Sequence, residues 1–319
     1  MMNFFSSNLI VILIIYLVLP LADLFFDLNG ILIALLITVW MATVIFHELG
    51  HCFIAKCRGM RIAFISGLPG MYMNGRYFFK VPMYFSFGAM LAYKPLRKGH
   101  ITKHDIIWLN SGGFIFNLIS VLVLLLIDQL FSLDSYILNF AIWMNIIIGV
   151  VTGLNPFAAD GKSIWNLLRG KNDELKFYDS MNYIYDSEVS STRILEELDR
   201  DRDIISTYAS NIAWVERHVD SNEITQVYQT ELHDSETLNY KLIKAFQLLY
   251  KAADGHQIDD KEIEIFNEVN TSLYVVFGQV YEYFKTGDET ILDNLLRKRI
   301  WLPSQRENKL LINAIQRII

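Results

Sequence analysis

The sequence predicts an all-α membrane protein with about four transmembrane helices and a small membrane-associated β-hairpin or sheet, followed by a soluble α-helical domain. Long uncharged stretches, an uneven charge distribution and a helical pattern in the second half predict it. Of the 319 residues, positions 1–170 carry 11 Lys and Arg against 7 Asp and Glu, and positions 171–319 carry 17 against 27. We therefore expect a polytopic membrane domain over residues 1–170 and a helical domain over residues 171–319.

Four uncharged stretches are long enough to cross about 30 Å of hydrocarbon. They cover residues 1–22, 28–46, 106–127 and 135–159. The first stretch has no basic residue ahead of it and no small-residue cleavage site behind it, which is typical of a retained anchor.

The basic residues predict the orientation of these helices. Nine Lys and Arg lie from Lys56 to Lys103, and none lies in the turns at 23–29 and 128–134. Since basic loops stay in the cytoplasm, we expect a multi-pass protein of a cell membrane, of prokaryotic type, with both termini cytoplasmic.

Residues 62–93 alternate aromatic and small side chains without a long uncharged helix. Within them, Met73-Asn74-Gly75-Arg76 predicts a two-residue hairpin, because Asn-Gly accepts the positive φ values of a type I′ turn. A second extended segment runs from Val81 to Tyr93. The alternative for this whole region is an interfacial loop rich in aromatic residues.

The second half has helical periodicity from Ser187 onward. Apolar residues recur at three- and four-residue spacing, as in Leu238, Leu242, Ala245, Phe246 and Leu249. Breaks at 220–221, 233–234, 254–255 and 286–288, and Pro303, indicate six or seven helices. The acidic charge argues against nucleic-acid binding. Two roles stay open, a regulatory or stabilising module without chemistry and a groove for the cytoplasmic tail of a substrate.

His47-Glu48-Leu49-Gly50-His51 directly follows the second uncharged stretch, near its cytoplasmic end. Two histidines four residues apart lie on one face of a helix, about 6 Å apart along its axis, so both can bind one metal ion. Glu48 between them can act as the general base toward a zinc-bound water. The alternative is a helix end with two interfacial histidines.

A catalytic zinc site needs a third protein ligand. Asp160 is the strongest candidate, because it follows the fourth uncharged stretch at the expected depth of the histidines, and Gly153 and Pro156 interrupt the helix before it. Its alternative role is an aspartate that ends a transmembrane helix. The other candidates fit less well. One group lies in a basic and polar segment, and its members are His100, His104 and Asp105. The other group lies on the outer side of the membrane by the charge argument, and its members are Asp23, Asp27, Asp128 and Asp134.

With these residues in place, residues 30–165 resemble the site-2 protease family of intramembrane zinc metalloproteases. Three segments match in order: the motif at 47–51, Ser111-Gly112-Gly113-Phe114-Ile115-Phe116-Asn117, and Asn155-Pro156 to Asp160-Gly161. The resemblance implies that His47, His51 and Asp160 bind zinc, that Glu48 is the catalytic base, and that Asn155 positions the scissile carbonyl or its oxyanion. Asn117 would line the same bundle, in a catalytic role or as a packing residue.

The resulting interpretation is a zinc endopeptidase that cleaves a membrane-anchored protein or peptide near the cytoplasmic face of the bilayer. The resemblance also implies a sheet that dips into the membrane, whose edge could bind an unwound substrate by strand addition. The rival from another class is a non-catalytic metal-binding membrane protein, a sensor or transporter-like protein, which would bind metal without proteolysis. Few polar residues line the first and third apolar stretches, which disfavours a transport path.

Overall fold

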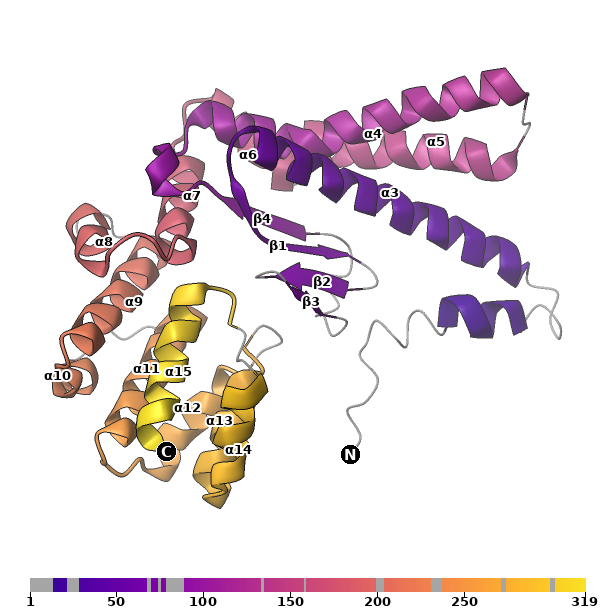
Figure 1. Ribbon diagram of the computed structural model, residues 1–319. Coiled ribbons are helices and arrows are strands. Elements are labelled where there is room, and N and C mark those ends of the chain that lie inside the picture. The colour runs from indigo at the N-terminus through magenta and orange to yellow at the C-terminus, as the bar shows by residue number, and fades with distance from the viewer. Residues whose placement is uncertain are drawn as a thin grey trace. The chain divides into compact units, whose positions relative to one another are not determined.

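The structure, a computed structural model, describes residues 14–21, 29–67, 70–73, 76–78, 89–132, 135–157, 159–198, 204–230, 237–270, 274–298 and 302–319. It is mostly helical and contains one small sheet (Figure 1). The chain divides into two compact units, Met1–Lys176 and Phe177–Ile319, close to the boundary expected at residue 170.

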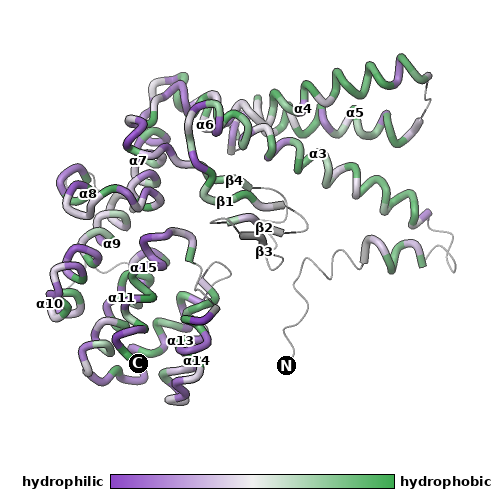
Figure 2. The backbone as a smooth tube through the Cα atoms, viewed as in Figure 1, coloured by the Kyte–Doolittle hydropathy of each residue, from purple (hydrophilic) through white to green (hydrophobic). Residues whose placement is uncertain are grey.

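Among the described residues of the first unit, three helices are long and apolar enough to cross a membrane. They are α3 (Gly30–Cys57), α4 (Lys103–Phe131), and α5 (Tyr136–Gly149), which the π-helical turn η4 (Val150–Leu154) extends. Figure 2 shows that apolar residues dominate all three. Large apolar side chains of α4 also point outward, at Leu118, Leu122, Leu126 and Leu130. An exposed apolar surface of this kind suits contact with hydrocarbon.

The apolar stretches and the helices differ in their bounds. The stretch at 28–46 is only part of α3, which continues through both motif histidines to Cys57. The stretch at 135–159 ends as a helix at Leu154, because the chain turns at Asn155 and Pro156 as the helix-breaking residues predict. The stretch at 1–22 lies mostly outside the described residues, which include only η1 (Ile14–Val18) and the three residues after it.

The sheet lies between α3 and α4 in the sequence and contacts α3 through β1 and β4. Its strands are β1 (Arg61–Gly67), β2 (Gly70–Met73), β3 (Arg76–Phe78) and β4 (Ala89–Tyr93), in the order β3-β2-β1-β4. All three pairings are antiparallel. Met73 pairs with Arg76, as the predicted two-residue hairpin requires, while the turn residues Asn74 and Gly75 lie outside the described residues. Of the extended segment predicted from Val81 to Tyr93, the described part is β4.

Two helices connect the units in sequence. Helix α6 (Ala159–Leu168) follows the turn after η4, and α7 (Asp173–Tyr185) crosses the boundary between the units. Helix α6 contacts α4 and η4.

The second unit is helical, as the periodicity predicts. Its further helices are α8 (Ser191–Leu198), α9 (Ile204–Asp220), α10 (Ile224–Gln229), α11 (Leu238–Ala253), α12 (Asp260–Glu268), α13 (Val276–Thr286), α14 (Glu289–Lys298) and α15 (Gln305–Ile318). These are eight described helices after Ser187, where the breaks indicated six or seven. Buried Phe246, Phe266 and Phe277 pack ring against ring in the core, which joins α11, α12 and α13. The predicted break at 233–234 lies outside the described residues.

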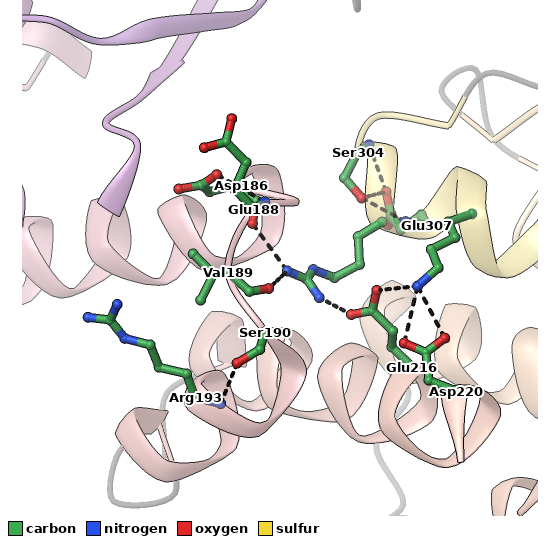
Figure 3. Close-up of polar contacts among 11 residues, drawn as sticks. Asp186, Glu188, Val189, Ser190, Arg193, Glu216, Asp220, Ser304 and Glu307 are labelled. Atoms are coloured by element: carbon green, nitrogen blue, oxygen red, sulfur yellow. Dashed lines mark hydrogen bonds and ion pairs between the residues drawn. The ribbon is translucent and has the colours of Figure 1, made fainter. Parts of the chain in front are cut away.

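A polar cluster also lies inside the second unit (Figure 3). The guanidinium of Arg306 is buried, donates to the carbonyls of Asp186 and Val189, and pairs with the carboxylate of Glu216. Lys309 extends this network to Asp220. Buried charge is costly unless it is paired, and the partners of Arg306 lie on other elements. The cluster therefore links α15 to α9 and to the loop before α8.

Candidate metal centre

Three side chains from two distant parts of the sequence meet in the first unit. His47 and His51 lie one turn apart on α3, and Asp160 lies in the first turn of α6. The Oδ2 atom of Asp160 is 3.1 Å from Nε2 of His47 and 3.2 Å from Nε2 of His51. The two Nε2 atoms are 3.2 Å apart. These three groups therefore lie close enough to hold a metal ion.

The size of this triangle agrees with zinc. A tetrahedral zinc ion with bonds of about 2.0 Å holds its ligand atoms about 3.3 Å apart. The observed separations of 3.1, 3.2 and 3.2 Å are close to that value. Two imidazoles and one carboxylate are also a ligand set found in catalytic zinc sites.

The hydrogen bonding of His51 points the same way. Its Nδ1 atom is 2.7 Å from the carbonyl oxygen of Leu109. A carbonyl only accepts, so Nδ1 carries the proton, and in the neutral ring Nε2 presents a lone pair to the other two groups. Lone pairs of an imidazole and a carboxylate repel unless a proton or a cation lies between them. The hydrogen bond from Nδ1 of His51 to the Leu109 carbonyl thus leaves Nε2 free to bind a metal ion.

Small residues allow α3 and α4 to approach closely at the site. A Cβ atom on Gly50 would lie 2.3 Å from the carbonyl oxygen of Gly112. A Cβ atom on Gly113 would lie 2.3 Å from Cε1 of His47, which is much shorter than a van der Waals contact between two carbon atoms. Glycine at both positions is therefore required for this packing, and Gly113 makes the space that the His47 imidazole occupies.

Asp160 reaches the histidines because the chain turns back after η4. The Oδ1 atom of Asn155 accepts from the backbone N–H of Phe157 at 3.0 Å, which stabilises the turn. A Cβ atom on Gly161 would lie 2.2 Å from the carbonyl oxygen of Asn155, so this glycine lets α6 pack on the turn. Trp165 then donates through Nε1 to the carbonyl of Leu154 at 3.0 Å.

Helix α4 holds α6 from the other side. Asn110 donates through Nδ2 to the Oγ of Ser163 at 2.9 Å, and both side chains are buried. Ser163 lies one turn after Asp160 on α6. This bond therefore helps to set the position of the carboxylate relative to α4.

Glu48 lies beside the three ligand candidates. Its side chain is buried, and it interacts electrostatically with His51 and with Asp160. A carboxylate in this position can accept a proton from a water molecule in the site.

The other residues named from the sequence lie in different surroundings. Asn117 is buried and contacts His47. Asn155 is half-buried and belongs to the turn before Asp160. Asp105 is the N3 residue of the capping box that begins α4. Its carboxylate also pairs with Arg58 and Lys94, which follow α3 and β4, so it is already engaged away from the histidines.

His100 and His104 are exposed, and Asp128 lies near the far end of α4. Asp23, Asp27 and Asp134 lie outside the described residues. The supporting residues Leu109, Asn110 and Ser163 were not identified as site residues from the sequence, since nothing in their local pattern sets them apart from ordinary helix-packing residues. Gly113 belongs to the matched segment at 111–117, but its contact with His47 was not predicted.

Comparison with known proteins produced no matching family model, no matching curated protein and no matching solved structure.

Proposed function

We propose that this chain is an intramembrane zinc endopeptidase that cleaves a membrane-embedded substrate peptide near the cytoplasmic face. The observation that carries the proposal is the triangle of His47, His51 and Asp160 with Glu48 beside it, within a bundle of helices apolar enough for a membrane. Buried ionisable groups in apolar helices are costly and typically functional.

In this proposal, the imidazoles of His47 and His51 and the carboxylate of Asp160 hold the zinc ion. Bound zinc supplies Lewis-acid polarisation of a carbonyl and makes a bound water acidic near neutral pH. Glu48 accepts the proton of the attacking water and delivers it to the leaving amine. Asn155 donates from its Nδ2 group to the oxygen of the scissile carbonyl as negative charge develops there. Its Oδ1 atom is already engaged by Phe157, which orients the amide.

The substrate must reach this site as an extended peptide, because a helix hides its amide bonds. Among the described strands, β3 and β4 lie at the edges of the sheet, and β4 contacts α3, the helix that carries both histidines. Strand addition at the edge of β4 would hold an unwound segment through backbone hydrogen bonds. The lipid bilayer would surround the outward apolar face of α4.

The test compares the wild-type protein with Glu48→Gln in the cell membrane. Quantitative proteomics of membrane peptides should reveal fragments that depend on Glu48, and zinc content should be equal in the two purified proteins. Persistent cleavage in Glu48→Gln would remove Glu48 from its role. Zinc binding without any Glu48-dependent fragment would favour the rival function, a non-catalytic metal sensor or transporter-like protein.

A further inference from the structure

We propose that Asn117 is a positioning residue that selects the tautomer of His47 by turning its side-chain amide. This inference rests on the proposed function only through the metal centre, and it does not depend on the substrate. In one orientation of the Asn117 amide, His47 donates a hydrogen bond to Asp160. In the other orientation, His47 can bind a metal ion.

The two side chains meet inside the bundle. Asn117 is fully buried on α4, one turn after Gly113, and its Nδ2 atom lies 3.3 Å from Nδ1 of His47. The opposite nitrogen of the ring, Nε2, faces Asp160 at 3.1 Å. The His47 imidazole is thus held between an amide at one edge and a carboxylate at the other.

A neutral imidazole carries one proton, and its position determines what the ring can bind. If Nδ1 accepts from the Nδ2 group of Asn117, the ring proton lies on Nε2 and is donated to Asp160. That arrangement is a closed hydrogen-bonded pair, and its Nε2 atom has no lone pair for a metal ion. To bind through Nε2, His47 must carry its proton on Nδ1, and Nδ1 then needs an acceptor.

Asn117 has that acceptor. Its Oδ1 atom is buried and has no hydrogen-bond partner among the described residues. Turning the amide by half a rotation exchanges Nδ2 and Oδ1, so that Oδ1 accepts from Nδ1–H of His47. Each orientation makes one bond to His47 and leaves one amide group unpaired. The two orientations therefore make the same number of hydrogen bonds to His47. A metal ion that binds to only one of the two tautomers of His47 can then shift the equilibrium toward the matching orientation of the amide.

His51 shows the contrast within the same centre. Its Nδ1 atom faces the Leu109 carbonyl, which cannot become a donor, so its tautomer is fixed in the metal-binding form. A side-chain amide can be donor or acceptor, so the tautomer of His47 can change with the state of the centre. One ligand is therefore ready in advance, and the other becomes ready when the amide turns.

The experiment measures zinc affinity of the full-length protein in nanodiscs by competition with a chelator, without any peptide substrate. Asn117→Asp places an acceptor permanently at Nδ1, so its affinity should equal or exceed that of the wild type. Asn117→Leu has no acceptor and should bind zinc about 10- to 100-fold more weakly. A packing asparagine predicts the opposite order, because a buried carboxylate is less well tolerated than leucine.

Asn145 gives the matched control. It is also a buried asparagine of an apolar helix, but it donates to Thr43 Oγ1 at 3.4 Å and to the Ala141 carbonyl at 2.9 Å. Asn145→Leu should change zinc affinity less than about 3-fold. Equal losses in Asn145→Leu and Asn117→Leu, or a loss in Asn117→Asp, would overturn the inference. If Asn117→Leu does not fold, Asn117→Asp against the wild type still decides it.

A spectroscopic readout separates this inference from the proteolytic function. The ¹⁵N shifts of His47 should show the proton moving from Nε2 to Nδ1 when zinc binds to the wild-type protein. If that change occurs in a protein that cleaves nothing, the inference stands and the proposed function fails. A proton that is already on Nδ1 before zinc binds would refute the switch.

Discussion

Asn110 and Ser163 form a buried hydrogen bond of 2.9 Å between α4 and α6, across 53 positions of the sequence. The residue before Asn110, Leu109, accepts from His51 at 2.7 Å. Two consecutive residues of α4 therefore engage one histidine of the centre and the helix that carries Asp160. Helix α4 contributes none of the three groups of the triangle, yet it aligns the helices that do.

The first prediction tests this alignment. Asn110→Ala and Ser163→Ala should each weaken zinc binding about 5-fold, since a hydrogen bond contributes about 1 kcal/mol. The double variant should be little worse than either single variant, because both changes remove the same bond. Chelator competition measures the affinities. Ser111→Ala is the control, because the Ser111 hydroxyl donates to the carbonyl of Ile107 on its own helix and so does not link α4 to α6. Full additivity of the two losses would show that the bond does not couple the helices.

The second prediction concerns the space for the His47 ring. Gly113→Ala places a Cβ atom 2.3 Å from Cε1 of His47, and the ring must move away from its partners. We expect at least a 10-fold loss of zinc affinity in a protein that still folds. Leu118→Ala is the control, because the Leu118 side chain is exposed on the same helix. Unchanged affinity in Gly113→Ala would show that the centre adapts to a methyl group at this position.

The sequence predicts those parts of the site that depend on geometry within one helix. His47 and His51 are close because a four-residue separation brings them to one face of α3. Asp160 could also be identified, since Gly153 and Pro156 interrupt the helical run that precedes it. The bond between Asn110 and Ser163 and the contact of Gly113 with His47 depend on how separate helices pack. No local spacing contains that information.

The limits of the helices show the same division. Hydropathy identifies residues 28–46, but α3 runs to Cys57, because backbone hydrogen bonding continues after the apolar side chains end. In the second unit, α10 has only six residues, which is too short for periodicity to reveal. The sheet order places β4 beside β1, and only long-range pairing determines that order.

The third prediction concerns Arg306 in the second unit. Its guanidinium donates to two carbonyls and pairs with Glu216, and a lysine ammonium cannot reproduce that planar arrangement. Arg306→Lys should lower the free energy of unfolding by about 3 kcal/mol. Urea unfolding of the full chain, followed by circular dichroism, measures the change. Arg317→Lys, at an exposed site, should stay within about 0.5 kcal/mol. Equal stability of the two variants would mean that the Arg306 network contributes little.

The fourth prediction is a pH dependence at Glu307. This carboxyl is buried, and burial raises its pKa above the ordinary value of 4.5, against the hydrogen bonds that Tyr208 and Ser304 donate. Burial also raises the pKa of Tyr208, which keeps its hydroxyl a donor. Above pH 4.5 the unfolded chain releases the proton of Glu307 while the folded chain still holds it. Stability from this group is therefore present at low pH and is lost as pH rises toward the folded pKa.

Glu307→Gln removes this ionisation, so the stability of the wild type minus that of Glu307→Gln should fall as pH rises from 4.5. The slope cannot exceed about 1.4 kcal/mol per pH unit for one proton. Urea unfolding at several pH values between 4 and 8 measures the difference, and taking a difference cancels the titration of all other groups. Glu196→Gln, at an exposed position of α8, is the control for the substitution of glutamate by glutamine itself. A difference that increases with pH would mean that the folded protein favours the charged carboxylate, because its hydrogen bonds then outweigh the cost of burial.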